Sequence, residues 1–233
     1  MINKLLIKPD QNLGKGITSF MLTKKYFDKH LIKFDNSSVE EFIISTLGVP
    51  IVWMDQVHGT KVQLIRENTV NFIEACDGLY TEKENIALAV KTADCLPLIL
   101  CSKEGKELTV LHVGWRGLHR GIVENAIMNF KSATGNLVAW LAPCISAQNY
   151  EVSKDVYSLF QDSDSESISS FKLSDNKDKW IFSLKQECAR RLQKFDIQVI
   201  TNTFCTFKDE KLFYSYRKNS STNRMVTLAW RQK

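Results

Sequence analysis

Two histidines and one cysteine occupy positions from which they could carry out chemistry. His58 follows an apolar segment and precedes a Gly-Thr turn, Cys95 lies between two apolar segments, and His112 ends a third. Functional sites are often built where strands end. Two imidazoles and one thiolate suit zinc, and three protein ligands leave the fourth tetrahedral position open, as in catalytic zinc sites. The spacing alone does not show that the three residues converge, because isolated His and Cys residues are also common as packed groups.

Two further segments carry residues that suit an anionic or nucleotide-like ligand. The segment Gly114–Gly117 predicts a turn that opens a helix, where free N–H groups beside Arg116 form a natural anion site. The alternative is a glycine turn with Arg116 in a surface ion pair. Tyr216 and Arg217 lie in a run that could stack on and grip a nucleotide-like ligand, or form a strand end with a solvated basic tip.

The elements that must position these residues are strands and isolated helices. Apolar or alternating segments predict strands over Ile51–Met54, Lys61–Arg66, Asn85–Val90, Leu96–Cys101, Leu108–Val113, Leu137–Leu141, Gln198–Thr201 and Lys211–Ser215. Helical spacing and capping residues predict helices over Val39–Leu47, Leu118–Phe130, Lys154–Phe160 and Ser183–Phe195. Because the two kinds of element do not alternate regularly, the sequence favours an α+β fold, with layered mixed β-sheets flanked by helices, in a single domain.

The segment Gln161–Lys179 is rich in Ser, Asp and Lys and poor in large apolar residues. It predicts a mobile surface loop within one domain over residues 1–233 rather than a domain boundary. Two other histidines, His30 and His119, are expected at the surface, since His119 stands beside Arg120 on the polar side of a predicted helix.

Composition excludes several classes of protein. The chain has 233 residues, of which 44% are hydrophobic and 24% charged, which rules out a disordered, collagen-like or disulfide-stapled protein. The net charge of +5 is spread along the chain and does not indicate nucleic-acid binding. No segment reaches the roughly 18 apolar residues of a membrane span, and no signal peptide is evident. We therefore expect no membrane partner, a cytoplasmic location and reduced thiols at the six cysteines.

Several segments, taken together and in chain order, resemble one family. They are Asp55–Gly59 (DQVHG), Asp77–Thr81 (DGLYT), Thr92–Pro97 (TADCLP), His112–Gly117 (HVGWRG), Pro143 with Tyr150–Val152, Cys205–Thr206 and Tyr214–Arg217 (YSYR). The chain is similar to the YfiH family, also called the laccase-domain or multicopper polyphenol oxidase family, whose members carry the name purine nucleoside phosphorylase. The segment Gly16–Leu22 departs from the family pattern, because it lacks the Arg and the Gly pair usual there.

The resemblance implies a zinc site formed by His58, Cys95 and His112, with copper as the less favoured metal. It implies phosphorolysis of adenosine, inosine, guanosine and methylthioadenosine, and hydrolytic deamination of adenosine. The implied partners are purine nucleosides and phosphate, and the chain is expected to be a monomer or homodimer. For this chemistry we expect catalytic roles for Cys95, Asp94, His112 and Arg116. We expect substrate contacts from Gln56, Asp77, Arg116, Tyr216 and Arg217.

Two carboxylates are candidates for the proton carrier that deamination needs: Asp94, which is next to Cys95, and then Asp77. Each has an alternative role in capping a turn or orienting a ligand imidazole.

Other functions remain open. One is a metal-free hydrolase with Cys95 as nucleophile and His112 as its base. Another, also implied by the resemblance, is a hydrolase that edits peptidoglycan precursors in the same pocket. Copper-dependent phenol oxidation is disfavoured, because a multicopper cluster needs more imidazoles than four histidines supply.

Overall fold

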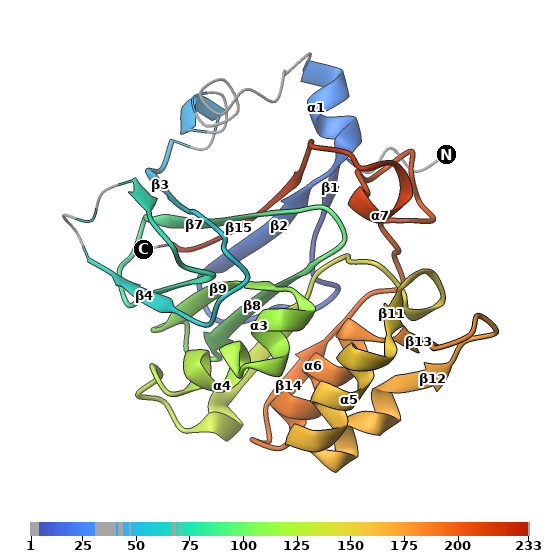
Figure 1. The fold of residues 1–233 in the computed structure, drawn as a ribbon. Helices are drawn as coiled ribbons and strands as arrows, with labels where there is room; N and C mark the ends of the chain where they lie inside the picture. The colour runs from blue at the N-terminus through green and yellow to red at the C-terminus, as the bar shows by residue number, and fades with distance from the viewer. Residues whose placement is uncertain are drawn as a thin grey trace.

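The computed structural model of the chain describes residues 5–30, 41, 44–46, 48–66, 69 and 71–232. Within that part, two large mixed sheets and one small sheet form a layered arrangement with helices (Figure 1). Among the described residues no helix combines the length and the apolar character needed to cross a membrane. The fold class predicted from the sequence, layered mixed sheets flanked by helices in one domain, is confirmed.

The first sheet is six-stranded and carries both ends of the described chain. Its order is β1 (Leu6–Ile7), β2 (Ile17–Leu22), β15 (Met225–Arg231), β7 (Ala87–Thr92), β3 (Ile51–Met54) and β5 (Phe72–Ile73). Pairing is antiparallel from β1 to β7, whereas β3 runs parallel to both β7 and β5. On its outer face, Phe27 of α1 (Lys24–His30) packs with apolar side chains of β2, β3 and β15.

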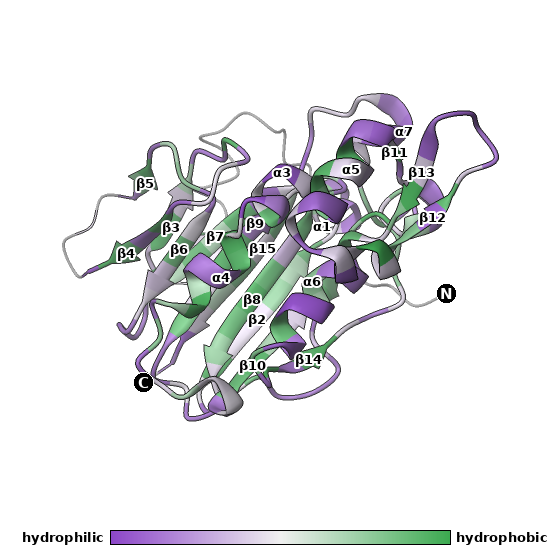
Figure 2. Ribbon diagram, turned by 60° about the horizontal axis from the view of Figure 1, so that its bottom comes forward, coloured by the Kyte–Doolittle hydropathy of each residue, from purple (hydrophilic) through white to green (hydrophobic). Residues whose placement is uncertain are grey.

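The second sheet lies between the first sheet and a layer of helices. Its order is β14 (Gln198–Ile200), β10 (Leu137–Leu141), β8 (Leu96–Ser102), β9 (Leu108–Val113), β6 (Gly78–Thr81) and β4 (Val62–Ile65). On β8, alternate residues face opposite cores: Leu98 packs toward the helices and Ile99 toward the first sheet. Because both faces are buried, the strand is a continuous apolar run rather than an alternating one. Figure 2 shows these strands coloured as hydrophobic beneath the helices.

The helices cover the second sheet and lead into the small third sheet. They are α3 (Trp115–His119), α4 (Ile122–Ile127), α5 (Lys154–Ser163) and α6 (Leu184–Gln193), with 3-10 turns η1 (Thr134–Asn136), η2 (Ala147–Asn149) and η3 (Ser165–Ser170). A further short helix, α7 (Tyr216–Asn219), lies away from this layer (Figure 1). The third sheet has the order β11 (Glu151–Ser153), β13 (Lys179–Phe182) and β12 (Phe171–Leu173). As predicted, the Ser183 hydroxyl caps α6 by accepting a hydrogen bond from the backbone N–H of Gln186.

Two local predictions are wrong, and a third falls mostly outside the described residues. The helix predicted over Leu118–Phe130 is split into α3 and α4, because Gly121 adopts a left-handed backbone conformation with φ of 90°. The range Lys211–Ser215 forms a turn and not a strand, since the N–H of Phe213 bonds back to the carbonyl of Asp209. The helix predicted over Val39–Leu47 lies for the most part outside the described residues.

The loop expected over Gln161–Lys179 is instead built largely of secondary structure. It contains the end of α5, the whole of η3 and strand β12. Two of its serines are buried, and the hydroxyls of Ser167 and Ser170 donate to the buried carboxylate of Glu187. Part of the polar composition of this segment therefore serves internal hydrogen bonds.

Candidate metal centre and its cleft

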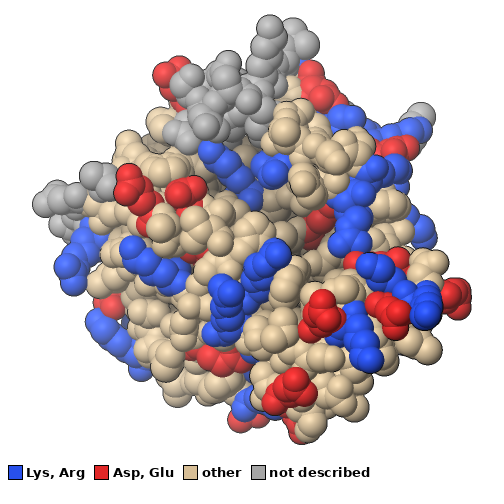
Figure 3. All heavy atoms as spheres, viewed as in Figure 1, with Lys and Arg blue, Asp and Glu red and all other residues tan. Residues whose placement is uncertain are grey.

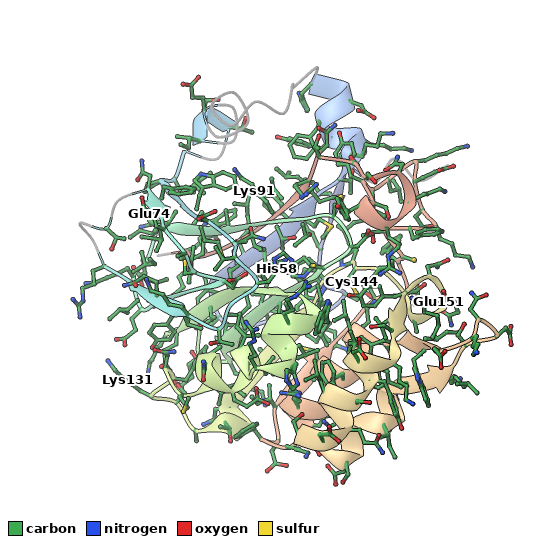
Figure 4. All side chains as sticks on the ribbon, in the orientation of Figure 1. His58, Glu74, Lys91, Lys131, Cys144 and Glu151 are labelled. Carbon is green, nitrogen blue, oxygen red and sulfur yellow. The ribbon has the colours of Figure 1, made fainter. Side chains whose placement is uncertain are left out.

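The three candidate metal ligands converge. The potential ligand atoms of His58, Cys95 and His112 all lie within 4.8 Å of one another, and the two imidazole rings meet edge to face with centroids 4.7 Å apart. Cys95 directly precedes β8, and His112 lies on the neighbouring antiparallel strand β9, opposite Pro97. His58 follows β3 of the other sheet, and Figure 4 shows it near the centre of the molecule. The site therefore joins the two large sheets.

Asp77 lies behind this cluster and holds two of its members. One carboxylate oxygen, Oδ1, lies 2.7 Å from Nδ1 of His112 and also accepts the backbone N–H of His58 at 2.9 Å. The other, Oδ2, accepts the N–H groups of Val57 and Gly59. The side chain is completely buried. Burial raises the pKa of Asp77, but the hydrogen bonds from His112 and the turn outweigh it and keep the pKa below its usual value. We expected Asp77 to contact substrate, whereas its carboxylate is bonded to His112 and to the His58 turn and does not line the cleft described below.

The turn that carries His58 is tightly fitted to the segment after β9. His58 has a φ of 58°, a left-handed conformation that is uncommon for a residue other than glycine. A Cβ atom added at Gly114 would lie 2.9 Å from Cδ2 of His58 and 3.4 Å from Sγ of Cys95. One at Gly117 would lie 2.7 Å from the carbonyl oxygen of Gly59. Both glycines of the Gly114–Gly117 segment are therefore required by close approach to the His58 turn.

Electrostatics favour a charged Cys95–His112 pair. Burial raises the pKa of the Cys95 thiol, but His112 and His58 outweigh it and lower the pKa to about 6. Burial lowers the pKa of His112, but Cys95 and Asp77 outweigh it and raise the pKa to about 9. The thiols of Cys101 and Cys144 have pKa values raised by burial to about 12. Cys95 thus differs from these two cysteines in its readiness to form a thiolate, the form that binds metals.

The donor set fits zinc. A thiolate and two imidazoles are borderline-soft ligands that zinc favours. With Nδ1 of His112 bound to Asp77, Nε2 is the nitrogen left for a metal, the usual arrangement of a ligating histidine with an outer carboxylate. The structure thus supports a metal-binding cluster of His58, Cys95 and His112.

The cluster opens into a cleft of about 660 Å³. Most residues that the sequence singled out line it, including Asp94, Arg116, Tyr216 and Arg217. Arg116 is exposed, and its guanidinium stacks on Trp115 at 4.5 Å. Figure 3, which has the orientation of Figure 1, shows Lys and Arg side chains near the centre of the visible face, over α3 and near α7. The cleft is therefore suited to a ligand that carries negative charge.

Gln56 lines the same cleft but is engaged with the backbone. Its side-chain Nε2 donates to the carbonyl of Lys91 at 2.7 Å, and its Oε1 accepts the N–H of Lys91 at 2.9 Å. The amide thereby ties the segment that follows β3 to Lys91 on β7. We expected Gln56 to contact substrate, whereas its amide already makes two backbone hydrogen bonds and fixes the position of Lys91.

Several residues of the cleft were not expected from the sequence. Phe72, Lys91 and Arg224 line it, and so does Ile145, which also lines a second cavity of about 390 Å³. Lys91 directly precedes the Thr92–Pro97 motif, which could have suggested it, but Phe72 lies on a two-residue strand with no signal in the sequence. His119 was expected at the surface, yet its Nδ1 is buried without a partner among the described residues, and its ring meets Phe160 at 5.3 Å.

Comparisons with known proteins agree with this architecture. The sequence profile of the family described as multi-copper polyphenol oxidoreductase laccase matches residues 36–232, and the chain belongs to that family. It is 33% identical to "Purine nucleoside phosphorylase YfiH" of Escherichia coli K12 over 191 residues, covering 81% of this chain and 77% of that protein. It is 30% identical to "Purine nucleoside phosphorylase" of Haemophilus influenzae over 241 residues, covering 96% and 98%.

Solved structures confirm the fold. The crystal structure of Neisseria meningitidis protein NMB0706 has a TM-score of 0.90 and 26% identity, and the match covers 99% of this chain and 100% of that one. YlmD of Geobacillus stearothermophilus matches with a TM-score of 0.80 at 20% identity, covering 98% and 99%. At that identity the second similarity concerns the fold alone.

Proposed function

We propose that this protein is a zinc-dependent purine nucleoside phosphorylase that acts on adenosine, inosine, guanosine and methylthioadenosine, and that also deaminates adenosine. The observation that carries the proposal is the His58–Cys95–His112 cluster at a cleft bordered by arginines. The names of the Escherichia coli and Haemophilus influenzae relatives support the substrate class. A location in the cytoplasm and a monomeric or homodimeric state complete the proposal.

In phosphorolysis, a phosphate oxygen bonds to the anomeric carbon of the sugar while the bond from that carbon to the purine nitrogen breaks. The purine leaves with the bonding electrons and takes up a proton. The protein must therefore hold an anion beside the sugar, and Arg116 and Arg217 are the cleft residues we assign to it. Tyr216 is exposed at the same cleft and offers a face for the base or sugar.

His58, Cys95 and His112 would hold the metal, and Asp77 would orient His112 toward it. When bound, zinc with three protein ligands supplies a Lewis acid with one position left for substrate or water. The imidazole of His112 is fixed by Asp77 and does not rotate freely, so the donor atoms are preorganised.

Elemental analysis and a turnover assay test the proposal. Protein purified without added metal is expected to hold one zinc per chain, and His58→Ala and Cys95→Ala are expected to hold none. The parent is expected to release hypoxanthine from inosine only when inorganic phosphate is present. Release that does not depend on phosphate would overturn the phosphorylase assignment. Copper in place of zinc, with phenol oxidation, would overturn the metal assignment.

A second candidate is favoured by one observation. Asp77, His112 and Cys95 stand in the order carboxylate, imidazole, thiol, with the Cys95 pKa lowered to about 6, and this is the arrangement of a cysteine hydrolase. Its substrate would include peptidoglycan precursors bound in the same cleft. Activity that persists after metal removal and is abolished by alkylation of Cys95 would favour this candidate over the zinc enzyme.

A further inference from the structure

The carboxylate of Asp94, the residue next to Cys95, accepts three hydrogen bonds. Its side chain is buried, and both carboxylate oxygens are in use. Oδ1 accepts the hydroxyl of Thr206 at 2.7 Å. Oδ2 accepts the hydroxyl of Ser215 at 2.9 Å and the backbone N–H of Arg217 at 2.6 Å. These donors come from two segments that lie more than 100 positions away in the chain.

The backbone of Asp94 adds a further connection. Its carbonyl accepts the N–H of Ile145 at 3.0 Å, which attaches the segment that follows β10. Its φ is 90°, a left-handed conformation in which Asp and Asn are tolerated better than most residues. Strained backbone of this kind persists where the surroundings fix it, and it often marks a functional site.

These contacts connect the metal centre to the cationic side of the cleft. Asp94 is joined to Cys95 by the chain, and to the Ser215–Arg217 segment by hydrogen bonds. Ser215 also caps α7, since its hydroxyl accepts the N–H of Lys218 at 3.2 Å. The Arg217 guanidinium is placed by a hydrogen bond to the carbonyl of Glu151 at 2.8 Å, and by the Tyr150 ring at 4.8 Å. Asp94 therefore adds a buried backbone anchor to the two contacts that place the Arg217 side chain.

We propose that Asp94 is a positioning residue whose buried carboxylate fastens the segment carrying Arg217 to the turn carrying Cys95, and so sets the anion site at a fixed place beside the metal centre. This assignment differs from that of a proton carrier, because three donors already occupy the carboxylate. It rests on the proposed function, since a placed anion site is needed only if an anion such as phosphate is a substrate.

The test is the substitution Asp94→Asn, which keeps side-chain size and tolerance of the left-handed backbone but removes the charge and turns one acceptor into a donor. The matched control is Asp209→Asn in the neighbouring segment. Asp209 also accepts a backbone N–H, that of Cys205 at 3.0 Å, and it does not line the cleft. Both variants and the parent are compared in zinc content, in binding of inorganic phosphate by calorimetry, in turnover of inosine and in amide hydrogen exchange.

For Asp94→Asn we expect zinc content to stay at the parent level. Losing a charge-assisted hydrogen bond should weaken phosphate binding and raise the KM for phosphate by about tenfold, while the KM for inosine stays within about twofold. Exchange of the Arg217 amide should accelerate by about tenfold, because its acceptor is lost. Asp209→Asn should change none of these quantities by more than about twofold.

Unchanged exchange at Arg217, or unchanged phosphate affinity, would overturn the inference. A different result for Asp94→Asn would also overturn it: a lower kcat and the loss of one limb of the pH–rate profile, with the KM for phosphate unchanged. That result is the behaviour expected when a proton carrier is removed. The parent could also bind phosphate without turning over inosine, and Asp94→Asn could weaken that binding. This result would overturn the proposed phosphorylase function but would support the positioning role of Asp94.

Discussion

Asp77 and His112 are bound to each other through Oδ1 and Nδ1 at 2.7 Å, and the same oxygen of Asp77 accepts the backbone N–H of His58. One buried carboxylate thus fixes the imidazole of His112 on β9 and the backbone of the His58 turn, which follows β3 of the other large sheet. The alignment of the three candidate metal ligands therefore depends on Asp77.

Replacing Asp77 by Asn should weaken zinc binding by about 10- to 100-fold, the usual effect of losing a carboxylate behind a ligating histidine. Competition with a chromogenic chelator measures this change. Thermal unfolding in chelator is the control, because it separates loss of metal from loss of fold. Unchanged zinc affinity in a folded Asp77→Asn variant would contradict the orienting role.

Metal-stripped protein should be alkylated first at Cys95. A pKa lowered to about 6 means that the thiolate is formed as pH rises through 6, whereas the Cys101 and Cys144 thiols, with pKa about 12, stay protonated at pH 7. Peptide mapping after brief iodoacetamide treatment between pH 5 and 9 measures the order. Zinc should protect Cys95, and labelling of Cys144 ahead of Cys95 would refute the electrostatic account.

Adding one methyl group at Gly114 should disturb the centre. The new Cβ would lie 2.9 Å from the His58 ring, so Gly114→Ala should displace His58, reduce zinc occupancy and cost about 1–3 kcal/mol of folding free energy. Gly135→Ala is the matched control, because no atom lies within 4 Å of the corresponding Cβ. Zinc content and urea unfolding measure both effects, and equal behaviour of the two variants would contradict the packing argument.

Removing the cleft arginines should affect phosphate more than metal. Arg116→Gln is expected to raise the KM for phosphate by about tenfold or more and to leave the zinc content unchanged, since a charge-assisted contact is lost. Arg120→Gln is the control, because Arg120 is exposed and does not line the cleft. Steady-state kinetics at varied phosphate distinguish the two, and a phosphate dependence untouched by Arg116→Gln would remove this residue from the anion site.

The stability of the α5–η3–α6 region should depend on pH through Asp164. Burial raises the pKa of Asp164, but Lys194 and Arg190 outweigh it and lower the pKa to about 2. Because the pKa of Asp164 is lower in the folded state than in the unfolded state, its ionised carboxylate stabilises the fold above about pH 4. This stabilisation is lost as the pH falls toward 2 and the carboxylate takes up a proton. Asp164→Asn should therefore cost roughly 1 kcal/mol at pH 7, with screening reducing it, and almost nothing near pH 2. Urea titrations at both pH values measure this, and an equal cost at both would contradict the ion-pair origin.

The sequence predicts well where local pattern and packing coincide. Ile51–Met54, Leu108–Val113 and Leu137–Leu141 are strands with the predicted bounds, because long apolar runs leave few alternatives. Strands β2 and β15 were missed, although β15 lies within the first sheet next to β7. Their register is set by partners far away in the chain, such as Thr227 opposite Met21, which no local window contains.

The candidate site, like the fold, could be predicted from the sequence only in part. Convergence of His58, Cys95 and His112 was expected only through the family resemblance, because it depends on how the two sheets pack. The three hydrogen bonds on Asp94 could not be predicted, since their donors come from Thr206 and from the Ser215–Arg217 segment. Spacing in one sequence does not encode such contacts.

Ile145 lines both the metal-centre cleft and the second cavity, and its N–H is held by the carbonyl of Asp94. The backbone at this point is anchored, so the side chain of Ile145 forms a fixed part of the wall between the two spaces, and Leu184, which lines the cleft beside Ser183 and Lys185 of the second cavity, forms another. A smaller residue at position 145 would thin this wall, and a larger one would thicken it. The length of ligand that the cleft admits could therefore change through this one position, with His58, Cys95 and His112 left as they are.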